Sequence, residues 1–252
     1  MEIGFGIGQL TAIRTDVSNP TPRQFGVIQD VSVDFAGSIK ELFGQYGFPA
    51  GAARGEIKVT GKAKAAKLSA SMYNDLFFGG SSSTGQSLIA IGEGPTPIPT
   101  TPFTITVTNS ATWVADLGVI NNATGLPFTR VASGPTAGQY SVAAGVYTFA
   151  SADNVSSISV KISYKYTQAA GSWPNATGTT LTLTNQLMGT SPIFKLEMSN
   201  GFNSLYQSIT LNQCISSKLG FALKNNDWVI PEFEFSAFVD SSNNLGTIST
   251  AE

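Results

Sequence analysis

The chain has 252 residues, of which 12% are charged and 42% are hydrophobic, and its net charge is −2 at neutral pH. This length allows one large β domain or two smaller ones, and the abundance of glycine and apolar residues is typical of a folded strand-and-turn protein rather than a disordered one. A net charge so close to zero excludes a strong overall field that would hold nucleic acid or a membrane surface tightly.

The N-terminal region carries no pattern of a targeting segment. It has an acidic Glu2, no basic run before an apolar core and no cleavage-site pattern. No stretch approaches the roughly 20 apolar residues that a membrane-spanning helix needs, and the single Cys214 cannot close a disulfide within the chain. We therefore expect synthesis in the cytoplasm, no membrane insertion and a fold that does not depend on disulfides.

Two runs of alternating apolar and polar residues between Phe25 and Lys67 predict a long β-hairpin, because side chains two residues apart lie on the same face of a strand. Glycines and Pro49 between the runs predict the turn. The apolar parity comprises Val27, Val31, Val33, Phe35, Ile57, Val59, Gly61 and Ala63. The polar parity comprises Asp30, Ser32, Asp34, Glu56, Lys58, Thr60, Lys62 and Lys64. We expect one face of the hairpin to be packed and the other to be wet, with charges of both signs.

Apolar residues at helical spacing follow the hairpin and predict a helix of about three turns. They are Leu68, Met72, Tyr73, Leu76 and Phe77, and Gly79 takes the position of a C-terminal cap. Such a one-sided helix is expected to cover the apolar face of a sheet.

The segments GGSSSTGQS (79–87) and GEGPTPIPTTP (92–102) predict a flexible spacer and then a stiff, proline-rich boundary. Short strand-like runs from 103 to 167 predict a small β-sandwich of their own. After a second soft linker, QAAGSWPNATGTT, long alternating strands resume. The interpretation is an all-β chain with one short helix: a discontinuous β-sandwich domain of residues 1–98 and 178–252, and an inserted, immunoglobulin-like β-sandwich of residues 101–170.

The chain contains no histidine, which excludes Ser-His-Asp and Cys-His catalysis and every metal site that needs a histidine. Glu232 and Glu234 share a strand face and could imitate a glycosidase pair, but two solvated acids opposite Phe233 and Phe235 are the favoured interpretation. Cys214 is expected to fill the core. We expect no enzyme, no catalytic residue, no cofactor and no metal.

Three segments carry a resemblance to a known family: GSIKELFGQYGFPAGAARGEIKVTGKAKAAKLSASMYNDLFFG (37–79), QSITLNQCISSKLGFALKNNDWVIPEFEFSAF (207–238) and GTIS (246–249). Together they resemble major tail tube proteins of long-tailed bacteriophages. The runs TWVADLGV, TRVASGPTAGQYSVAAGVYTFA and ISYKYT of the insert are similar to segments of phage virion proteins.

The resemblance implies a virion protein of which six copies form a ring, each donating four strands to one closed barrel around a central channel, with rings stacked into a tube. At a strand spacing of about 4.8 Å and a tilt near 40°, such a barrel has a circumference of roughly 150 Å and a width of about 45 to 50 Å, enough for a nucleic-acid duplex. Closing the barrel would also remove the unpaired edges of a long hairpin.

In such a barrel the polar parity would line the channel, at Asp30, Ser32, Asp34, Glu56, Lys58, Thr60 and Lys62. The apolar parity would supply core and assembly contacts, at Val31, Val33, Phe35, Ile57 and Val59. A lining of mixed sign favours transient, non-specific passage of double-stranded DNA over its capture. The resemblance implies as further partners a tape-measure protein and tail terminator and tip proteins.

The inserted domain favours a non-contractile tail, because an extra domain outside the tube would collide with a contractile sheath. Repeated along a tube, it would bind host-surface glycans weakly but with high avidity. The alternative from another class is a carbohydrate-binding or capsid-decorating β-sandwich module, with Trp113, Trp173, Tyr140 and Tyr147 as contact aromatics.

Overall fold

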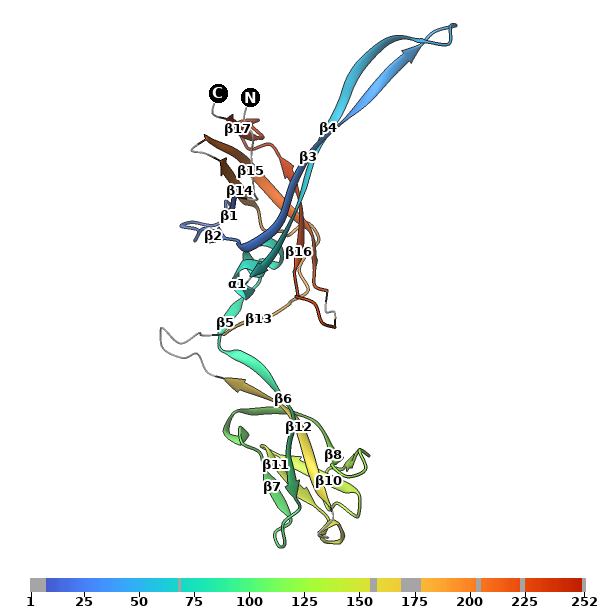
Figure 1. Cartoon of the computed structure of the whole chain (residues 1–252), viewed down its shortest axis with the longest axis vertical. Helices are drawn as coiled ribbons and strands as arrows, with labels where there is room; N and C mark the ends of the chain where they lie inside the picture. The colour runs from blue at the N-terminus through green and yellow to red at the C-terminus, as the bar shows by residue number, and fades with distance from the viewer. Residues whose placement is uncertain are drawn as a thin grey trace. The chain divides into compact units, whose positions relative to one another are not determined.

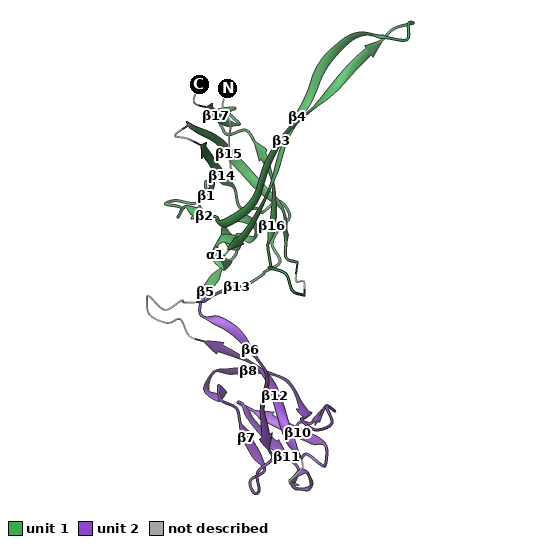
Figure 2. Cartoon of the chain, viewed as in Figure 1, with its two compact units in different colours: residues 1–82, 181–252 green, residues 83–180 purple. Residues whose placement is uncertain are grey.

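The computed structural model describes residues 8–67, 69–154, 158–168, 178–202, 205–222 and 225–250. The chain divides into two compact units, residues 1–82 with 181–252 (unit 1) and residues 83–180 (unit 2), as Figure 2 shows. The fold is all-β with one short helix, as the sequence predicts. None of the described helices is both long and apolar enough to cross a lipid bilayer.

Unit 1 is built on one eight-stranded sheet with the order β2-β1-β14-β15-β16-β4-β3, and β17 pairs with β15 beside this path (Figure 1). Its strands are β1 (Gln9–Arg14), β2 (Arg23–Gln24), β3 (Gly26–Phe43), β4 (Pro49–Lys67), β14 (Phe194–Phe202), β15 (Leu205–Gly220), β16 (Glu232–Phe238) and β17 (Gly246–Thr250). All the described pairs in this sheet are antiparallel. Pairing of segments far apart in the chain, such as β4 with β16, makes unit 1 a single discontinuous body.

A short helix covers the core of unit 1. α1 (Ala70–Tyr73) begins at Ser69, whose hydroxyl accepts a hydrogen bond from the Met72 N–H, and continues into the π-helical turn η1 (Asn74–Phe78). Gly79 ends it in the left-handed conformation with φ 60°, as predicted, and its N–H donates to the Asn74 carbonyl. Leu68, part of the predicted helix, lies outside the described residues.

The core of unit 1 is formed by the helix and by the inward-facing residues of the sheet. Its buried side chains come from the helix and from six strands or their flanks: Leu10, Ala12, Phe25, Val59, Ala63, Ala65, Met72, Leu76, Phe194, Leu196, Leu211, Cys214, Phe233 and Phe235. Cys214 is a buried free thiol, as expected of a core residue.

The outer part of the β3–β4 hairpin runs past the rest of the sheet (Figure 1). β16 pairs with β4 only from Val59 to Lys64, and beyond this point β3 and β4 pair only with each other. We call residues 36–58 the hairpin arm. It exposes large apolar side chains, among them Ile39, Leu42, Phe43, Tyr46 and Phe48.

Unit 2 is a two-sheet sandwich. One sheet has the order β7-β11-β10-β9 and the other β6-β12-β8. The strands are β6 (Gln86–Pro97), β7 (Thr104–Thr106), β8 (Trp113–Asn121), β9 (Thr129–Arg130), β10 (Gln139–Ala143), β11 (Val146–Phe149) and β12 (Ser159–Gln168). Tyr147, Tyr164, Ile162, Val160 and Val119 are fully buried between the sheets.

Residues 82–97 differ from the sequence interpretation, which placed a spacer and a boundary there. β5 (Ser82–Thr84) pairs with β13 (Thr179–Leu181), and β6 pairs with β12 along most of its length. The boundary between the units therefore lies at residue 82 and not at 98. Pro95 and Pro97 do not stop the ladder because β6 is an edge strand, where a missing N–H can face away from the neighbouring strand.

Candidate functional site

Four neighbouring strands of unit 1, in the order β15-β16-β4-β3, carry a continuous polar face. Lys64 lies opposite Asp30 on one side and Glu232 on the other, and Lys62 lies opposite Ser32 and Glu234. On β15, Lys218 lies opposite Glu234. We call this the charged face, made of Asp30, Ser32, Asp34, Thr60, Lys62, Lys64, Lys218, Glu232, Glu234 and Ser236. The alternate residues of β4 and β16 point into the core.

The sign of the charge alternates from strand to strand across the charged face. Lys218 Nζ lies 2.8 Å from Glu234 Oε1 and 3.5 Å from Glu232 Oε1. Lys64 Nζ lies 3.8 Å from Glu232 Oε2, and Lys62 Nζ lies 4.0 Å from Asp30 Oδ2. The hydrogen bond from Lys218 lowers the pKa of Glu234, and the same bond raises the pKa of Lys218. β15 is therefore positive, β16 negative, β4 positive and β3 negative.

Both edges of this four-stranded region are open within the described part of the chain. β3 ends the sheet, and no described strand pairs with its outer edge. β14 pairs with β15 only up to Cys214, so residues 215–220 pair with β16 alone. Because all the pairs are antiparallel, β15 and β3 run in opposite directions. The two free edges are thus the positive strand β15 and the negative strand β3.

The predicted channel-lining residues share one parity of the hairpin, as the sequence indicates. Glu56, Lys58, Thr60 and Lys62 on β4 are exposed, and Asp30 and Asp34 on β3 are half-buried or exposed. Ser32 differs, because its Oγ is buried and has no hydrogen-bond partner among the described residues.

The predicted core positions divide into two groups. Val59 is buried, and Val31 and Val33 are half-buried against the core. Phe35 and Ile57, by contrast, are 49% and 54% exposed, so they are not part of the core of the single chain, and the assembly contacts predicted for them stay a prediction. The reason is that β16 stops pairing with β4 at Val59, and the hairpin arm begins there.

Sequence reasoning missed Lys218 and the contribution of β16. Glu232 and Glu234 alternate with the buried Phe233 and Phe235, as expected for solvated acids, but the sequence does not say that β16 lies beside β4. A β-bulge in β15 lies between Ser216 and Lys218. A second irregularity, opposite residues 194–196 of β14, places Cys214 in the core and exposes Ile215. These shifts break the alternation that would have revealed the face of Lys218.

Two of the four aromatics proposed for a glycan site, Tyr140 and Tyr147, are buried in unit 2. Tyr140 and Tyr147 are 2% and 0% exposed, and their hydroxyls donate to the buried Asp116 carboxylate at 2.6 and 3.0 Å. Trp113 Nε1 donates to the Tyr147 hydroxyl at 3.4 Å. Trp173 lies outside the described residues. Tyr140 and Tyr147 therefore cannot present their rings to a ligand.

Among the described residues there is no group of three or more Cys, Asp or Glu side chains arranged to hold a metal ion. No protein-family model matches the chain, and no curated protein matches it.

Proposed function

We propose that this chain is a structural tube subunit of a bacteriophage tail, and that the charged face lines the tube. Copies would join β3 of one chain to residues 215–220 of the next, so that four strands from each copy continue one sheet until it closes. The observation that supports this most strongly is the opposite charge of the two free edges. Joining them would place Asp30 and Asp34 beside Lys218 and continue the alternation of sign around the barrel.

Strand direction supports the same arrangement. With β15 and β3 antiparallel to each other, any number of copies can join edge to edge into a wholly antiparallel barrel. Closure removes both edges, which a monomer would leave open to uncontrolled pairing. We propose six copies for each ring, the number that the family resemblance implies.

The proposed lumen would carry nearly balanced acids and lysines, many already paired within one chain. Such a surface offers no uniformly basic track that would hold phosphates by releasing counterions. The proposed role is therefore to contain a tape-measure protein and to let double-stranded DNA pass. The exposed apolar side chains of the hairpin arm, which no described residue covers in the single chain, would supply contacts between stacked rings.

Disulfide trapping tests the proposed edge contact. In one chain Asp34 and Ser217 lie on the two outer strands, about 14 Å apart by strand spacing, too far for the roughly 7 Å limit of a disulfide. Oxidation of the double variant Asp34→Cys with Ser217→Cys should therefore give a ladder of linked chains that ends at the closed ring. Asp30→Cys with Ser217→Cys tests a second register.

A control variant and an independent measurement complete the trapping experiment. Glu197→Cys with Ser217→Cys moves one thiol to β14, away from both edges, and should give no ladder. Negative-stain electron microscopy of the unmodified chain over a concentration series should show six-fold rings or hollow tubes. The proposal would be contradicted if the chains form no rings or tubes in the micrographs and give no ladder of linked chains in either register.

A further inference from the structure

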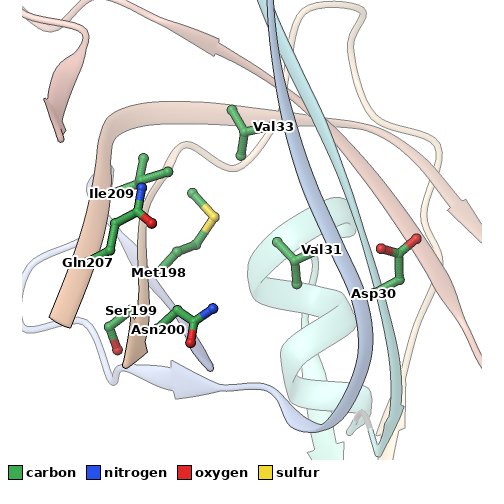
Figure 3. Close-up of a pocket in the computed structure, with 8 residues that line it drawn as sticks. All are labelled: Asp30, Val31, Val33, Met198, Ser199, Asn200, Gln207 and Ile209. Carbon is green, nitrogen blue, oxygen red and sulfur yellow. The ribbon is translucent and has the colours of Figure 1, made fainter. Parts of the chain in front are cut away.

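The described residues leave a pocket of about 280 Å³ beside β3, one of the two free edges of the four-stranded region (Figure 3). Val31 and Val33 line it from β3, and Met198 and Ile209 face them from β14 and β15. All four side chains pack against the core of unit 1 but are only half-buried. The described lining includes no residue of β4, so the pocket lies on the unpaired side of β3. Apolar surface is therefore left uncovered at this free edge.

The other free edge, at the end of β15, carries apolar side chains on the same side of the sheet. Leu219 lies opposite Phe233, whose side chain is in the core, so Leu219 belongs to the core side. Phe221 follows two residues later and shares this parity. Its ring meets the ring of Tyr73 in α1 edge to face, at a centroid distance of 5.0 Å, yet Phe221 is still 53% exposed. We call Leu219 and Phe221 the apolar pair of the β15 edge.

The strand register brings the apolar pair to the pocket when two copies join as proposed above. Residues directly opposite each other in an antiparallel ladder share a face, and their side chains are in contact. With Lys218 of one copy opposite Asp34 of the next, the apolar pair falls opposite Val33 and Val31. The lysine and the acid then meet on the charged face, and the apolar side chains meet on the core side.

Charge favours this register over the neighbouring one. Asp34 is exposed and takes part in no salt bridge among the described residues, so its carboxylate is available to a lysine of another copy. Asp30, the other acid of this edge, already lies 4.0 Å from Lys62 of its own chain. With Lys218 opposite Asp30, Phe221 would fall opposite residue 27, which is not among the described residues that line the pocket.

We propose that the apolar pair of one copy fills the pocket beside β3 of the next copy, with the Phe221 ring between Val31 and Met198. The occupant of the pocket is thus a second copy of this chain. The inference rests on the proposed edge contact and deepens it, because it adds a buried aromatic anchor to the meeting of opposite charges. Pair and pocket lie at opposite edges, so each copy uses both, as a closed ring requires.

Disulfide trapping on the core side tests this inference. In one chain residues 31 and 221 are separated by three strand spacings, about 14 Å, which exceeds the roughly 7 Å limit of a disulfide. Oxidation of Phe221→Cys with Val31→Cys should therefore link chains into a ladder. Phe221→Cys with Phe35→Cys is the matched control and should give no ladder, because Phe35 shares the strand and face of Val31 but lies about 13 Å further along β3. Cys214 does not compete, because it is fully buried.

Comparison with the trapping of Asp34 and Ser217 separates this inference from the proposed function. A ladder from Asp34→Cys with Ser217→Cys, but none from Phe221→Cys with Val31→Cys, would overturn the filling of the pocket and leave the edge contact standing. The absence of both ladders would overturn both proposals.

A second measurement needs no disulfide. Phe221→Ala should raise at least ten-fold the concentration at which rings form, because the ring of Phe221 is half exposed in the single chain and would be buried in the assembly. Tyr206→Ala is the matched control and should leave this concentration unchanged, because Tyr206 is 69% exposed on the part of β15 that β14 already covers. Ring formation at the same concentration in both variants would overturn the inference, even if rings form readily.

Discussion

Gly61 on β4 lies directly opposite Phe235 on β16, and the ring of Phe235 occupies the space that a side chain at Gly61 would need. An ideal Cβ at Gly61 would lie 2.4 Å from Phe235 Cζ and 2.6 Å from the Ser32 carbonyl oxygen. An aromatic ring over a cross-strand glycine compensates for the missing side chain of the glycine. The ring of Phe235 therefore fills the space beside Gly61 at the centre of the four-stranded region.

Gly61→Ala should therefore destabilise unit 1 by about 1 to 3 kcal/mol, the usual cost of overpacking a well-filled site. The Ser32 carbonyl belongs to the backbone of the neighbouring strand, so relief would have to come from movement of β3. Urea unfolding of the monomer measures the change. Gly44→Ala is the matched control, because nothing lies within 4 Å of its ideal Cβ. Equal midpoints for the two variants would contradict the contact.

The parity of β4 was predictable from the sequence, but its neighbours were not. Val59, Gly61 and Ala63 alternate cleanly with lysines and Thr60, and this local pattern placed the buried face correctly. The pairing of β4 with β16 joins segments about 170 residues apart, and no local pattern encodes which distant strands meet. The alternating charge of the face emerges only after that pairing.

The limits of the core were missed for a related reason. Phe35 and Ile57 continue the apolar parity to the base of the hairpin arm, where no described third strand covers them. Periodicity reports which residues share a face, and it does not report where that face leaves the body of the protein. Apolar alternation that continues beyond the covered region is what a surface completed by another molecule would also require.

Ser32 supplies a test of the charged face at a buried hydroxyl. Its buried Oγ has no partner among the described residues, and a buried hydroxyl without a hydrogen bond costs about 1 to 3 kcal/mol. Ser32→Ala should leave the free energy of unfolding of the monomer unchanged or raise it. Ser216→Ala is the matched control on β15 and should lower it, because Ser216 Oγ donates to the Glu234 carbonyl at 3.3 Å. Clear destabilisation by Ser32→Ala would show that its hydroxyl has a partner.

Cys214 should be unreactive in the folded protein. Its side chain is fully buried, and burial raises the pKa of the thiol to about 12 from its ordinary value of 9.0. Because the thiolate is the reactive form, labelling by a thiol reagent at pH 8 should occur only through unfolding and should accelerate with urea. Ser217→Cys on the same strand should label at once. Rapid labelling of Cys214 in native buffer would contradict its place in the core.

Unit 2 should lose stability in alkali. Burial, together with the neighbouring Asp116 carboxylate, raises the pKa of Tyr140 and of Tyr147 above the ordinary 10.0. The unfolded chain then releases the phenolic protons at a lower pH than the folded chain does. Their contribution is complete below about pH 10 and falls as the pH rises further.

Thermal unfolding of the full chain between pH 8 and pH 11, followed by tyrosinate absorbance, measures this slope. Tyr147→Phe should reduce the loss between pH 10 and 11, at a cost of about 1 to 3 kcal/mol at pH 8 from the donor taken from Asp116. Tyr206→Phe, at a 69% exposed position, is the control and should change neither quantity. An unchanged alkaline slope in Tyr147→Phe would show that other groups cause it.

Lys218 is the residue at which the proposed assembly and the fold of one chain can be separated. It is 55% exposed at the side chain, so its ion pairs with Glu232 and Glu234 contribute little to the stability of the monomer. At the proposed contact it is the positive charge that meets the acidic edge of β3. Lys218→Glu should therefore leave the urea midpoint nearly unchanged and raise several-fold the concentration at which rings form, most strongly at low salt. Lys195→Glu makes the same change of net charge on β14, where Lys195 pairs with Glu197, and should not affect assembly. If both variants weaken assembly equally, the effect belongs to net charge, and the opposite signs of the two edges do not direct the contact.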